Sequence, residues 1–488
     1  PFQSPLTAVP ASPVKLRKDP YILGIHGIIR AIKSNVAGRL PLSFIDLFND
    51  LGHTFGVKRF GVRSIMTRDH RNIQAMLATQ FDDFGLAHER RAHQAILGTR
   101  GIFTQDGPEW KESRALLRPS FDRASVADLS ALETFVTRMI AKIKASPGSD
   151  GYHEVDLQAL LLELTMDAST DFLFGSPIGA QEGTVSTEGE MSFSEAFDVS
   201  QDVVSIRFTL NDLYWLVNPK RFRIAITVVH KLVGHYVARA LQKHSSNSSA
   251  EKPYTKDTST SGKYIFLEAL SQKTQNPQVL QDQILSVMMA GRDTTASTLT
   301  WAFHVLSRHP EVLQKLRKEI LDTIGLQPPT QPDLRDMVYL RHFLHEVLRM
   351  YPPVGINSRS ALRTTTLPYG GGADGNAPIV VQKGERVMYS VFTVHRREDV
   401  YGPDAGTFRP ERWGEEAMRK VGWAWLPFNG GPRVCLGQQM ALTMAGYVVV
   451  RLLQAFGEVG DNGVPGGEVR YAVKIIMVPG QGLKVKMR

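Results

Sequence analysis

Cysteine is nearly absent from this sequence: Cys435 is the only one among 488 residues. A single thiol cannot form a disulfide within the chain, so a fold stabilised by internal disulfides is excluded. A zinc site built from several cysteines is excluded for the same reason. Any chemistry that needs the sulfur of a cysteine must therefore take place at Cys435.

Long apolar runs and a strong excess of one charge are also missing. No stretch reaches the ~18 consecutive apolar residues of a membrane span. The net charge of +9, from 57 Lys and Arg against 48 Asp and Glu, suits an acidic partner or an anionic membrane surface, but an ordinary basic surface explains it equally well. No basic run with interleaved aromatic residues indicates binding to nucleic acid.

The start of the chain, PFQSPLTAVPASPVKLRKDP, is rich in proline and polar side chains. This composition predicts a linker over residues 1–20. Because the sequence begins with proline and not methionine, we expect a targeting or anchoring segment to precede it. Residues 21–488 are predicted to form a single domain, with polar surface insertions at 175–190 and 244–262.

Most of the chain has the hydrophobic periodicity of α-helices. Apolar residues recur at spacings of three and four over 126–143 and over 340–350. Short segments typical of strands occur late in the chain, at 378–382, 386–391 and 473–478. The predicted fold is therefore mainly α with a small β portion.

One segment, residues 279–308, is apolar on nearly all faces and predicts a helix of ~45 Å. Such a helix is usually buried at the centre of a large protein. Its middle, AGRDTTAST, places Asp293 and Thr294 in that interior, at an energetic cost unless they have partners. Gly291 would let a ligand approach the backbone. These choices indicate a functional site in which Asp293 and Thr294 transfer protons, and a solvated polar patch is the alternative.

Glu346 and Arg349 lie three residues apart and share one face of the predicted helix 340–350. As an exposed ion pair they would contribute only a fraction of a kcal/mol. Further along, FRPERW carries Arg412 on a turn fixed by proline. A carboxylate held between two guanidinium groups would form a rigid buried clamp, because the planar fork of arginine binds carboxylates in a bidentate manner.

Cys435 lies in the glycine-rich segment FNGGPRVCLG, just before a predicted helix. Glycines such as Gly431 and Gly437 let the backbone turn tightly and approach a flat or bulky group. Arg433 and the helix N-terminus would both favour a thiolate, and Arg433 can also bind an external carboxylate. A lone cysteine is often a small buried apolar residue. Since the segment offers no histidine as a catalytic partner, a metal ligand fits Cys435 better.

In their order and spacing these motifs resemble those of the cytochrome P-450 family. The cysteine segment is similar to the family's haem-binding loop, and AGRDT is similar to its oxygen-activating helix motif. Glu346, Arg349 and Arg412 look like its glutamate–arginine–arginine clamp. WKESR is similar to its tryptophan-x-x-x-arginine motif, and one more arginine follows the clamp helix. The residues implied to bind the haem are Trp110, Arg114, Arg359, Phe428, Gly431, Arg433, Cys435 and Gly437.

The resemblance implies a cytochrome P-450 fold, with the long central helix over a haem b. Its iron would be ligated by the Cys435 thiolate. Trp110, Arg114, Arg359 and Arg433 would hold the haem propionates. Asp293 and Thr294 would organise water and deliver protons, and the enzyme would insert one oxygen atom of O2 into a substrate C–H bond. Electrons would come from NADPH through a reductase partner, because no flavin- or nicotinamide-binding fingerprint is visible. The glycines of LPYGGG are interpreted as a loop before a strand and not as a phosphate cradle.

At finer grain, the segments that begin at Gly101, Ile356 and Val394 look like the fungal branch that hydroxylates alkanes and fatty acids. That branch is typically anchored in the endoplasmic reticulum membrane, facing the cytosol. Arg292 and the NSRSALR segment are candidates to bind a substrate carboxylate. The expected walls of the substrate site are 84–101, 193–216, 287–298, 354–361 and 478–483.

Other functions remain open at this point. An oxidative tailoring enzyme for a fungal polyketide, terpenoid or related secondary metabolite is the main alternative. A haem-based sensor without turnover is less consistent with the Asp293-Thr294 pair, since a sensor needs no proton delivery. A haem-thiolate isomerase or dehydratase that ignores O2 is a further alternative.

Overall fold

The structure is a computed structural model, and most of the chain is described by it. The predicted linker lies outside the described residues except for 14–17, and so does most of the polar insertion at 244–262. The described residues are 14–17, 24–59, 61–86, 90–121, 129–183, 191–247, 264–462 and 469–488.

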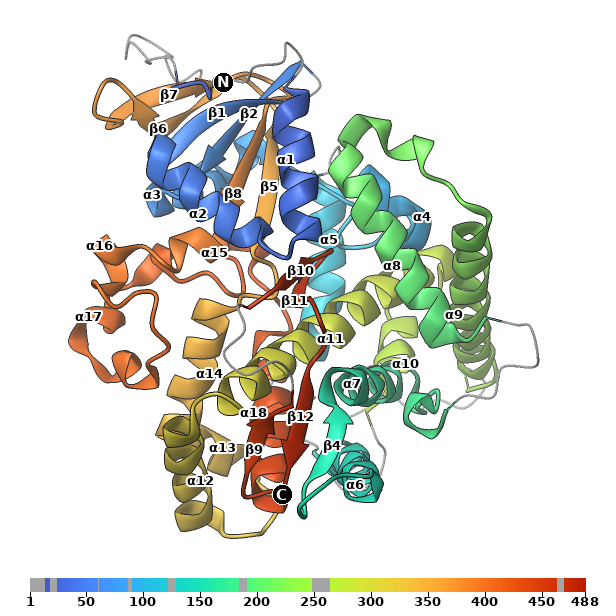
Figure 1. Ribbon diagram of the computed structural model, residues 1–488. Coiled ribbons are helices and arrows are strands. Elements are labelled where there is room, and N and C mark those ends of the chain that lie inside the picture. Colours follow the sequence, from blue (N-terminus) through green and yellow to red (C-terminus); the bar gives the residue numbers. More distant parts are fainter. Residues whose placement is uncertain are drawn as a thin grey trace.

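The long apolar segment forms one helix, α11 (Pro277–Leu306), which crosses the centre of the molecule (Figure 1). Asn276 caps it by accepting hydrogen bonds from backbone N–H groups of the first turn. The helix begins and ends two residues before the predicted 279–308. It packs along α7 (Leu157–Phe174) and α18 (Gln438–Ala455), which explains why it is apolar on nearly all faces.

The largest hydrophobic core lies among the helices around α11. Trp301 of α11 is fully buried there, and its ring stacks on that of Tyr351 at a centroid distance of 4.2 Å. The helices that surround this core, besides α7 and α18, are α6 (Ser130–Ala145), α12 (Pro310–Ile324) and α14 (Val338–Met350). The prediction of a mainly α fold with a small β portion is confirmed.

A five-stranded sheet forms a separate layer together with α1 (Ile25–Val36) and α2 (Leu40–Leu51), at the upper left of Figure 1. β2 and β8 pair in parallel, and the other pairs are antiparallel. The sequence did not predict β1 and β2. Gly56 lies within β1, where a Cβ atom would be only 2.6 Å from the Leu16 side chain. The strand order is β1 (Thr54–Arg59), β2 (Val62–Thr67), β8 (Arg386–Ser390), β5 (Ile356–Ala361) and β3 (Phe84–Gly85).

The predicted strand 473–478 is wrong in detail, because a turn divides it into β10 (Tyr471–Val473) and β11 (Met477–Pro479). Two side chains of α11 hold this hairpin in place through hydrogen bonds. The Ser297 hydroxyl donates to the Met477 carbonyl at 2.7 Å, and Trp301 Nε1 donates to the same oxygen at 3.1 Å. These contacts join segments far apart in sequence, so the local pattern could not reveal them.

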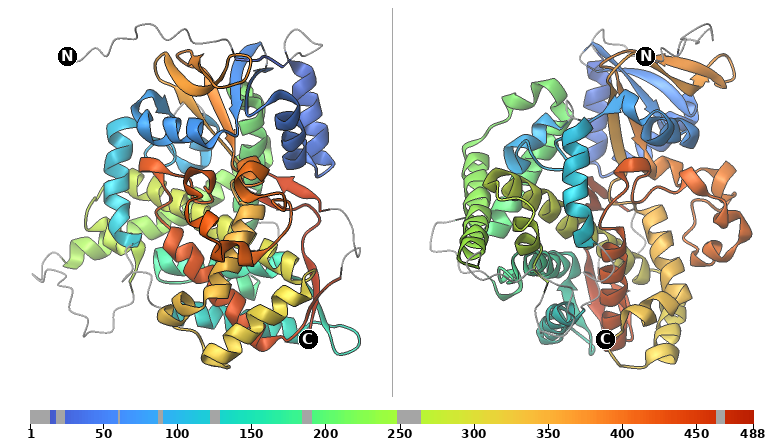
Figure 2. Two further views of the ribbon diagram at one scale, coloured as in Figure 1. Left: turned by 90° about the vertical axis from the view of Figure 1, so that its left-hand side faces the viewer. Right: turned by 180° about the vertical axis from the view of Figure 1, so that it is seen from behind.

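The remaining elements surround these layers. Figure 2 shows α5 (Gly107–Leu117) on the face of the molecule opposite to β10 and β11. The small sheets are β4 (His153–Asp156) with β12 (Lys484–Met487) and β9 (Val459–Asp461), and β6 (Thr365–Gly371) with β7 (Ala377–Val381). The other helices are α3 (His70–Gln74), α4 (Gln94–Leu97), α5 (Gly107–Leu117), α8 (Phe193–Leu210), α9 (Lys220–Asn247), α10 (Phe266–Ser271), α13 (Gln331–Asp336), α15 (Val391–Val394), α16 (Glu398–Tyr401) and α17 (Glu416–Arg419).

Within the part of the chain that the structure describes, one stretch of α9, Lys220–Lys243, has the length and hydropathy of a membrane span. Core helices of soluble proteins pass the same test.

Candidate active site

A cavity of about 750 Å³ lies against α11 and brings together side chains from both the helical and the β-rich parts of the chain. Its walls come from α1, α5, α8, α11, β5, the cysteine segment and the β10–β11 turn. The cavity is bordered by most of the residues that the sequence singled out, but Asp293, Gly431 and the three residues of the expected clamp do not border it. The bordering candidates are Trp110, Arg114, Thr294, Arg359, Phe428, Arg433, Cys435 and Gly437.

The cysteine segment folds back on itself just before α18. The Cys435 N–H donates to the Phe428 carbonyl at 3.0 Å, which closes the loop and turns the thiol into the cavity. The thiol is accessible from the cavity and shielded from bulk water by the surrounding protein. Burial raises the pKa of the Cys435 thiol, and the Gly437 N–H and the Arg114 charge act in the opposite direction. The sequence suggested that the charge of Arg433 favours the thiolate. In the structure that charge is on Arg114.

The loop depends on glycine at one position in particular. Gly431 has a φ of +67°, and a Cβ atom there would lie 1.9 Å from the Leu77 carbonyl oxygen. Asn429 also has a positive φ, of 63°, and its side chain accepts a hydrogen bond from the Tyr389 hydroxyl at 2.9 Å. Gly437 has no comparable restriction, since a Cβ there would meet only the Phe121 ring at ordinary contact distance.

Arginines gather beside this loop. Arg433 donates to the Asp106 carboxylate at 2.6 Å, and its guanidinium lies 4.3 Å from the Trp110 ring centroid. Arg114 donates to the Val434 carbonyl at 3.0 Å. Burial lowers the pKa of Arg433 to about 10. Asp106 opposes this shift, and the nearby arginines Arg359, Arg90 and Arg114 add to it.

This arrangement favours an anion from outside the chain. Mutual repulsion among the arginines would be relieved by negative charge brought into the cavity next to Trp110. Arg359 also faces the cavity from β5, where it is 3% exposed and donates to its neighbouring Ser358 carbonyl at 2.7 Å. Arg90 belongs to the same cluster and borders the cavity, although the sequence analysis did not single it out.

Asp293 and Thr294 are adjacent on α11 but point in different directions. The Thr294 hydroxyl borders the cavity and donates to the Ala290 carbonyl at 2.6 Å. The Asp293 carboxylate is 6% exposed and faces α8, where Gln201 Nε2 donates to it at 2.5 Å. Burial raises the pKa of the Asp293 carboxyl group, opposed chiefly by Arg292 and then by the Gln201 hydrogen bond.

Arg292 does not have the role suggested for it as a site for a substrate carboxylate. Its side chain is 2% exposed and does not border the cavity. It pairs with Asp198 at 2.5 Å and with Asp293 at 3.2 Å. The charge of Arg292 is therefore used inside the protein, where it balances the buried Asp293.

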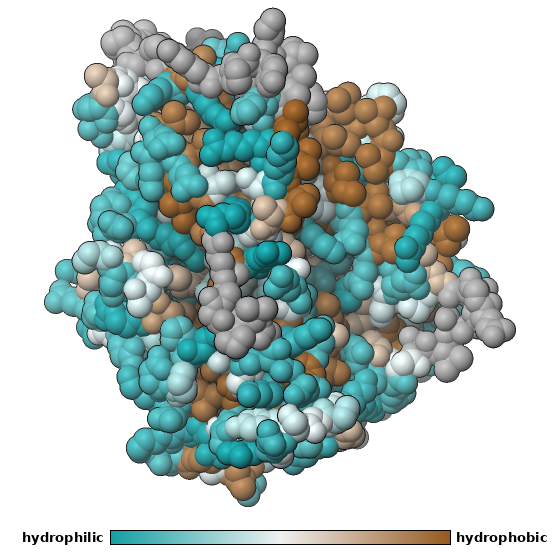
Figure 3. Space-filling view, viewed as in Figure 1, coloured by the Kyte–Doolittle hydropathy of each residue, from teal (hydrophilic) through white to brown (hydrophobic). Residues whose placement is uncertain are grey.

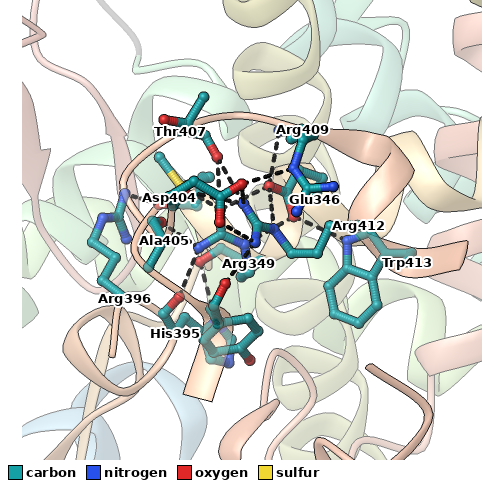
Figure 4. A network of polar contacts seen from close by, with 12 residues as sticks. Glu346, Arg349, His395, Arg396, Asp404, Ala405, Thr407, Arg409, Arg412 and Trp413 are labelled. Atoms are coloured by element: carbon teal, nitrogen blue, oxygen red, sulfur yellow. Dashed lines mark hydrogen bonds and ion pairs between the residues drawn. The ribbon is translucent and has the colours of Figure 1, made fainter. Parts of the chain in front are cut away.

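Figure 4 shows Glu346 in contact with both guanidinium groups of the expected clamp. Arg349 donates to the two carboxylate oxygens at 2.8 and 2.7 Å, and Arg412 Nε donates to one of them at 3.3 Å. All three side chains are at most 1% exposed. The Arg409 N–H and Trp413 Nε1 each donate to Glu346 at 3.0 Å, so every lone-pair direction of this buried carboxylate meets a donor.

The clamp also connects to the cysteine segment, a contact that no local pattern in the sequence predicts. Arg349 donates to the His395 carbonyl at 2.8 Å, and His395 Nδ1 contacts the Arg349 carbonyl at 3.1 Å. His395 Nε2 accepts a hydrogen bond from the Leu426 N–H at 2.8 Å. Since Nε2 accepts, Nδ1 carries the proton of the neutral ring. The clamp thereby fixes the chain that leads into the loop of Cys435.

Comparison with known proteins decides what this architecture is. The family model described as Cytochrome P-450 matches residues 22–462. The chain belongs to the cytochrome P-450 family. Its fold is accordingly the P-450 fold, in which α11 is the long central helix, and members of the family are monooxygenases that carry a haem bound through a cysteine thiolate.

The similar P-450s include several from fungi and yeasts. Cytochrome P-450 52A5 of Candida maltosa is 45% identical over 464 residues, which cover 91% of this chain and 85% of that protein. The protein described as cytochrome P-450 monooxygenase g430 of a Fusarium species is 44% identical over 454 residues, covering 90% and 78%. A cytochrome P-450 of Arthroderma benhamiae is 41% identical over 475 residues, covering 96% and 90%.

The cavity of this P-450 fits a haem in the chemistry of its donors. A thiol faces it from a loop that requires glycine at Gly431, and an arginine cluster with Trp110 lies at its edge. Of the expected substrate walls, 478–483 is wrong, because the β10–β11 turn at 473–477 borders the cavity instead. The wall formed by α1 was not predicted. The other expected stretches all contribute lining residues.

Proposed function

We propose that this P-450 hydroxylates a long apolar substrate, an alkane or a fatty acid, at a haem b whose iron is ligated by Cys435. The observation that carries the proposal is the lining of the cavity of about 750 Å³, which would hold both the haem and the substrate and extends from the Cys435 thiol to α1 and the β10–β11 turn. Its walls between these points are mostly aliphatic and aromatic. Such a lining favours an extended hydrocarbon through burial of apolar surface. Representative lining residues are Ile102, Phe103, Phe172, Phe208, Val287 and Ile475.

The protein's own residues would hold the haem from several elements. Trp110, Arg114, Arg359 and Arg433 would bind its propionates, and this would offset the repulsion within the arginine cluster. Phe428 and Gly437 border the cavity and would lie close to the macrocycle, while Gly431 would hold the loop in place by allowing its close approach to the Leu77 carbonyl. The haem, when bound, supplies the activation of O2 and the transfer of one oxygen atom into a C–H bond.

Proton supply is the task that falls to α11. The Thr294 hydroxyl borders the cavity beside Gly291 and can hold a water molecule there. Asp293, one residue earlier, is kept in the interior by Gln201 and Arg292. Its raised pKa suits a group that donates a proton to such a water near neutral pH.

Electrons would reach this P-450 from NADPH through a separate reductase. The proposal is supported by the context of the one G-x-G-x-x-G spacing in the sequence, at residues 370–375. This spacing lies at the end of β6 and in the turn to the antiparallel strand β7, whereas a flavin or nicotinamide site needs it between a strand and a helix. The family membership agrees with an external electron donor.

We further propose that the protein acts at the endoplasmic reticulum membrane, on its cytosolic face. Exposed apolar side chains gather on α1 and on the segment from the end of α8 to η6 (Asn211–Leu216), the two elements that flank one side of the cavity. They correspond to the brown areas at the upper centre and upper right of Figure 3. A lipid surface at this position would deliver apolar substrates directly to the cavity. These residues are Ile29, Ile32, Val36, Ile206, Trp215 and Leu216.

Ligand titration tests the substrate class. Purified haem-loaded protein is titrated with alkanes and with fatty acids of increasing chain length, and the haem spin-state shift is recorded. The proposal predicts a saturable shift whose midpoint falls as the chain lengthens, because each added buried CH2 contributes ~0.8 kcal/mol. The absence of a shift at every chain length, with a shift for polycyclic metabolites, would overturn the proposal in favour of a tailoring enzyme.

A further inference from the structure

Among the described residues that line the cavity, Gln201 is the one whose side chain donates a hydrogen bond to Asp293. It lies on α8, is 9% exposed, and borders the cavity with part of its surface. Its amide Nε2 donates to Asp293 Oδ2 at 2.5 Å. The contact joins residues 92 positions apart in the sequence, so the local pattern of α11 could not reveal it.

The Asp293 carboxylate is held from two directions. Gln201 binds Oδ2 from α8, and Arg292 contacts Oδ1 at 3.2 Å from the preceding position of α11. Arg292 is in turn fixed to α8 through Asp198 at 2.5 Å, and its guanidinium lies 5.5 Å from the Phe197 ring centroid. The Gln201 hydrogen bond and the Arg292 ion pair therefore both depend on the position of α8 relative to α11.

This geometry turns Asp293 away from the reaction space. Thr294, its neighbour, borders the cavity, while the Asp293 carboxylate lies behind the wall that Gln201 forms. A buried carboxyl group with so few donors keeps its position only while those donors stay in place. Movement of the Gln201 amide would free Oδ2 to turn toward another partner.

We propose that Gln201 is a positioning residue that fixes the Asp293 carboxyl group and couples it to contacts made at the α8 wall of the cavity. A ligand that touches this wall touches Gln201, so its shape affects the orientation of Asp293. The same side chain thereby links substrate occupancy to proton supply. The inference rests on the proton role of Asp293 and Thr294 given under the proposed function.

A double-mutant cycle tests the inference in the haem-loaded, reductase-supplied enzyme. Gln201→Leu removes the donor and keeps the volume, and Asp293→Asn removes the acid. We expect Gln201→Leu to lower the fraction of NADPH converted to hydroxylated product roughly tenfold, the size of one lost hydrogen bond to an acidic group. In the Asp293→Asn background the same change should have less than about a twofold effect, because its target is gone.

A matched control separates this effect from a general disturbance of α8. Glu195, in the first turn of α8, pairs with Arg221 in an ion pair in which both side chains are about half to two-thirds exposed, and neither residue borders the cavity. Glu195→Gln should leave the coupling of NADPH to product within about twofold. If Gln201→Leu does not fold, Gln201→Asn shortens the side chain by one methylene and removes the same contact while keeping an amide.

A spectroscopic readout does not depend on turnover. The difference infrared spectrum between the native protein and Asp293→Asn isolates the carboxyl C=O stretch of Asp293. We expect Gln201→Leu to move this band to higher frequency, since a carboxyl group that loses a donor has a stiffer C=O bond. An unmoved band would show that Gln201 does not hold Asp293 in solution.

The outcomes distinguish the two proposals. If Asp293→Asn leaves coupling intact, the proton role of Asp293 fails. If Asp293→Asn uncouples the enzyme but Gln201→Leu has the same effect in both backgrounds, the proton role stands and the positioning role of Gln201 is overturned. A tenfold effect confined to the native background, with the shifted infrared band, supports the inference.

Discussion

At the scale of single residues, the cysteine loop shows that its glycines are not equivalent. A Cβ at Gly430 would meet the Trp423 ring at 2.5 Å, but only Gly431 and Gly437 were singled out as haem-loop glycines by the sequence. Gly431 combines a φ of +67° with the close approach of the Leu77 carbonyl. Gly437 has neither restriction. The two glycines looked equivalent in the sequence, because the approach of η1 (Ala75–Thr79) to the loop is a tertiary contact.

Gly431→Ala should therefore displace the loop and weaken haem retention. The new Cβ would lie 1.9 Å from a backbone oxygen, which cannot give way as a flexible side chain would. We expect a loss of stability well above the ~1–2 kcal/mol of a left-handed non-glycine residue alone. Thermal unfolding and the haem-to-protein ratio after purification measure the effect.

Two glycines elsewhere serve as controls for this variant. Gly375 has a φ of +76° and open space around a Cβ, so Gly375→Ala reports the backbone strain by itself. Gly406 has open space and no such φ, so Gly406→Ala should be nearly neutral. An equal loss for Gly431→Ala and Gly375→Ala would mean that the contact with Leu77 does not matter.

At the scale of elements, the clamp joins α14 to the segment before the cysteine loop. Glu346 is fully buried and neutralises Arg349, while Arg412 shares the carboxylate with it. Glu346→Gln keeps the shape but leaves buried positive charge uncompensated. The expected loss of unfolding free energy is about 3–5 kcal/mol, together with a lower thermal midpoint.

An exposed pair provides the comparison for the clamp. Glu416 pairs with Lys420 at 3.1 Å, and both side chains are about four-fifths exposed. Glu416→Gln should change the free energy of unfolding by at most about 1 kcal/mol. If Glu346→Gln were as mild as this surface variant, the clamp would not be a structural support of the cysteine loop.

The elements also show how far the sequence could lead. α11 and α14 were predicted nearly to their ends, because their apolar periodicity is local. β1, β2 and the β10–β11 turn were missed or misjudged, since their strands are stabilised by partners far along the chain. The local pattern was enough to choose Asp293 and Thr294. It could not show that their side chains point in different directions, nor that Gln201 is the partner of Asp293.

At the scale of the whole molecule, buried histidines make stability depend on pH. Burial lowers the pKa of His395 to about 3, that of His304 to about 3 and that of His345 to about 4, from the ordinary value of 6.5. The unfolded chain therefore binds protons before the folded protein does as the pH falls. The free energy of unfolding must decrease from about pH 6.5 downward, and the loss ends only below the folded-state values.

Denaturant titrations at about pH 7.5 and about pH 5 measure this loss. We expect each of these histidines to contribute roughly 2 kcal/mol between the two conditions. His395→Asn should reduce the difference between the two pH values by that amount, whatever it does to stability at neutral pH. A pH-independent stability would contradict the neutral burial of His395.

The central claim is that Cys435 ligates the haem iron, and the carbon-monoxide difference spectrum of the reduced protein tests it most directly. The loop geometry and the thiol that faces the cavity predict that the native protein shows the long-wavelength Soret band that gives the family its name. Cys435→Ser should lose that band even where haem remains bound, because a hydroxyl cannot replace the thiolate. Retention of the band in Cys435→Ser would contradict the account.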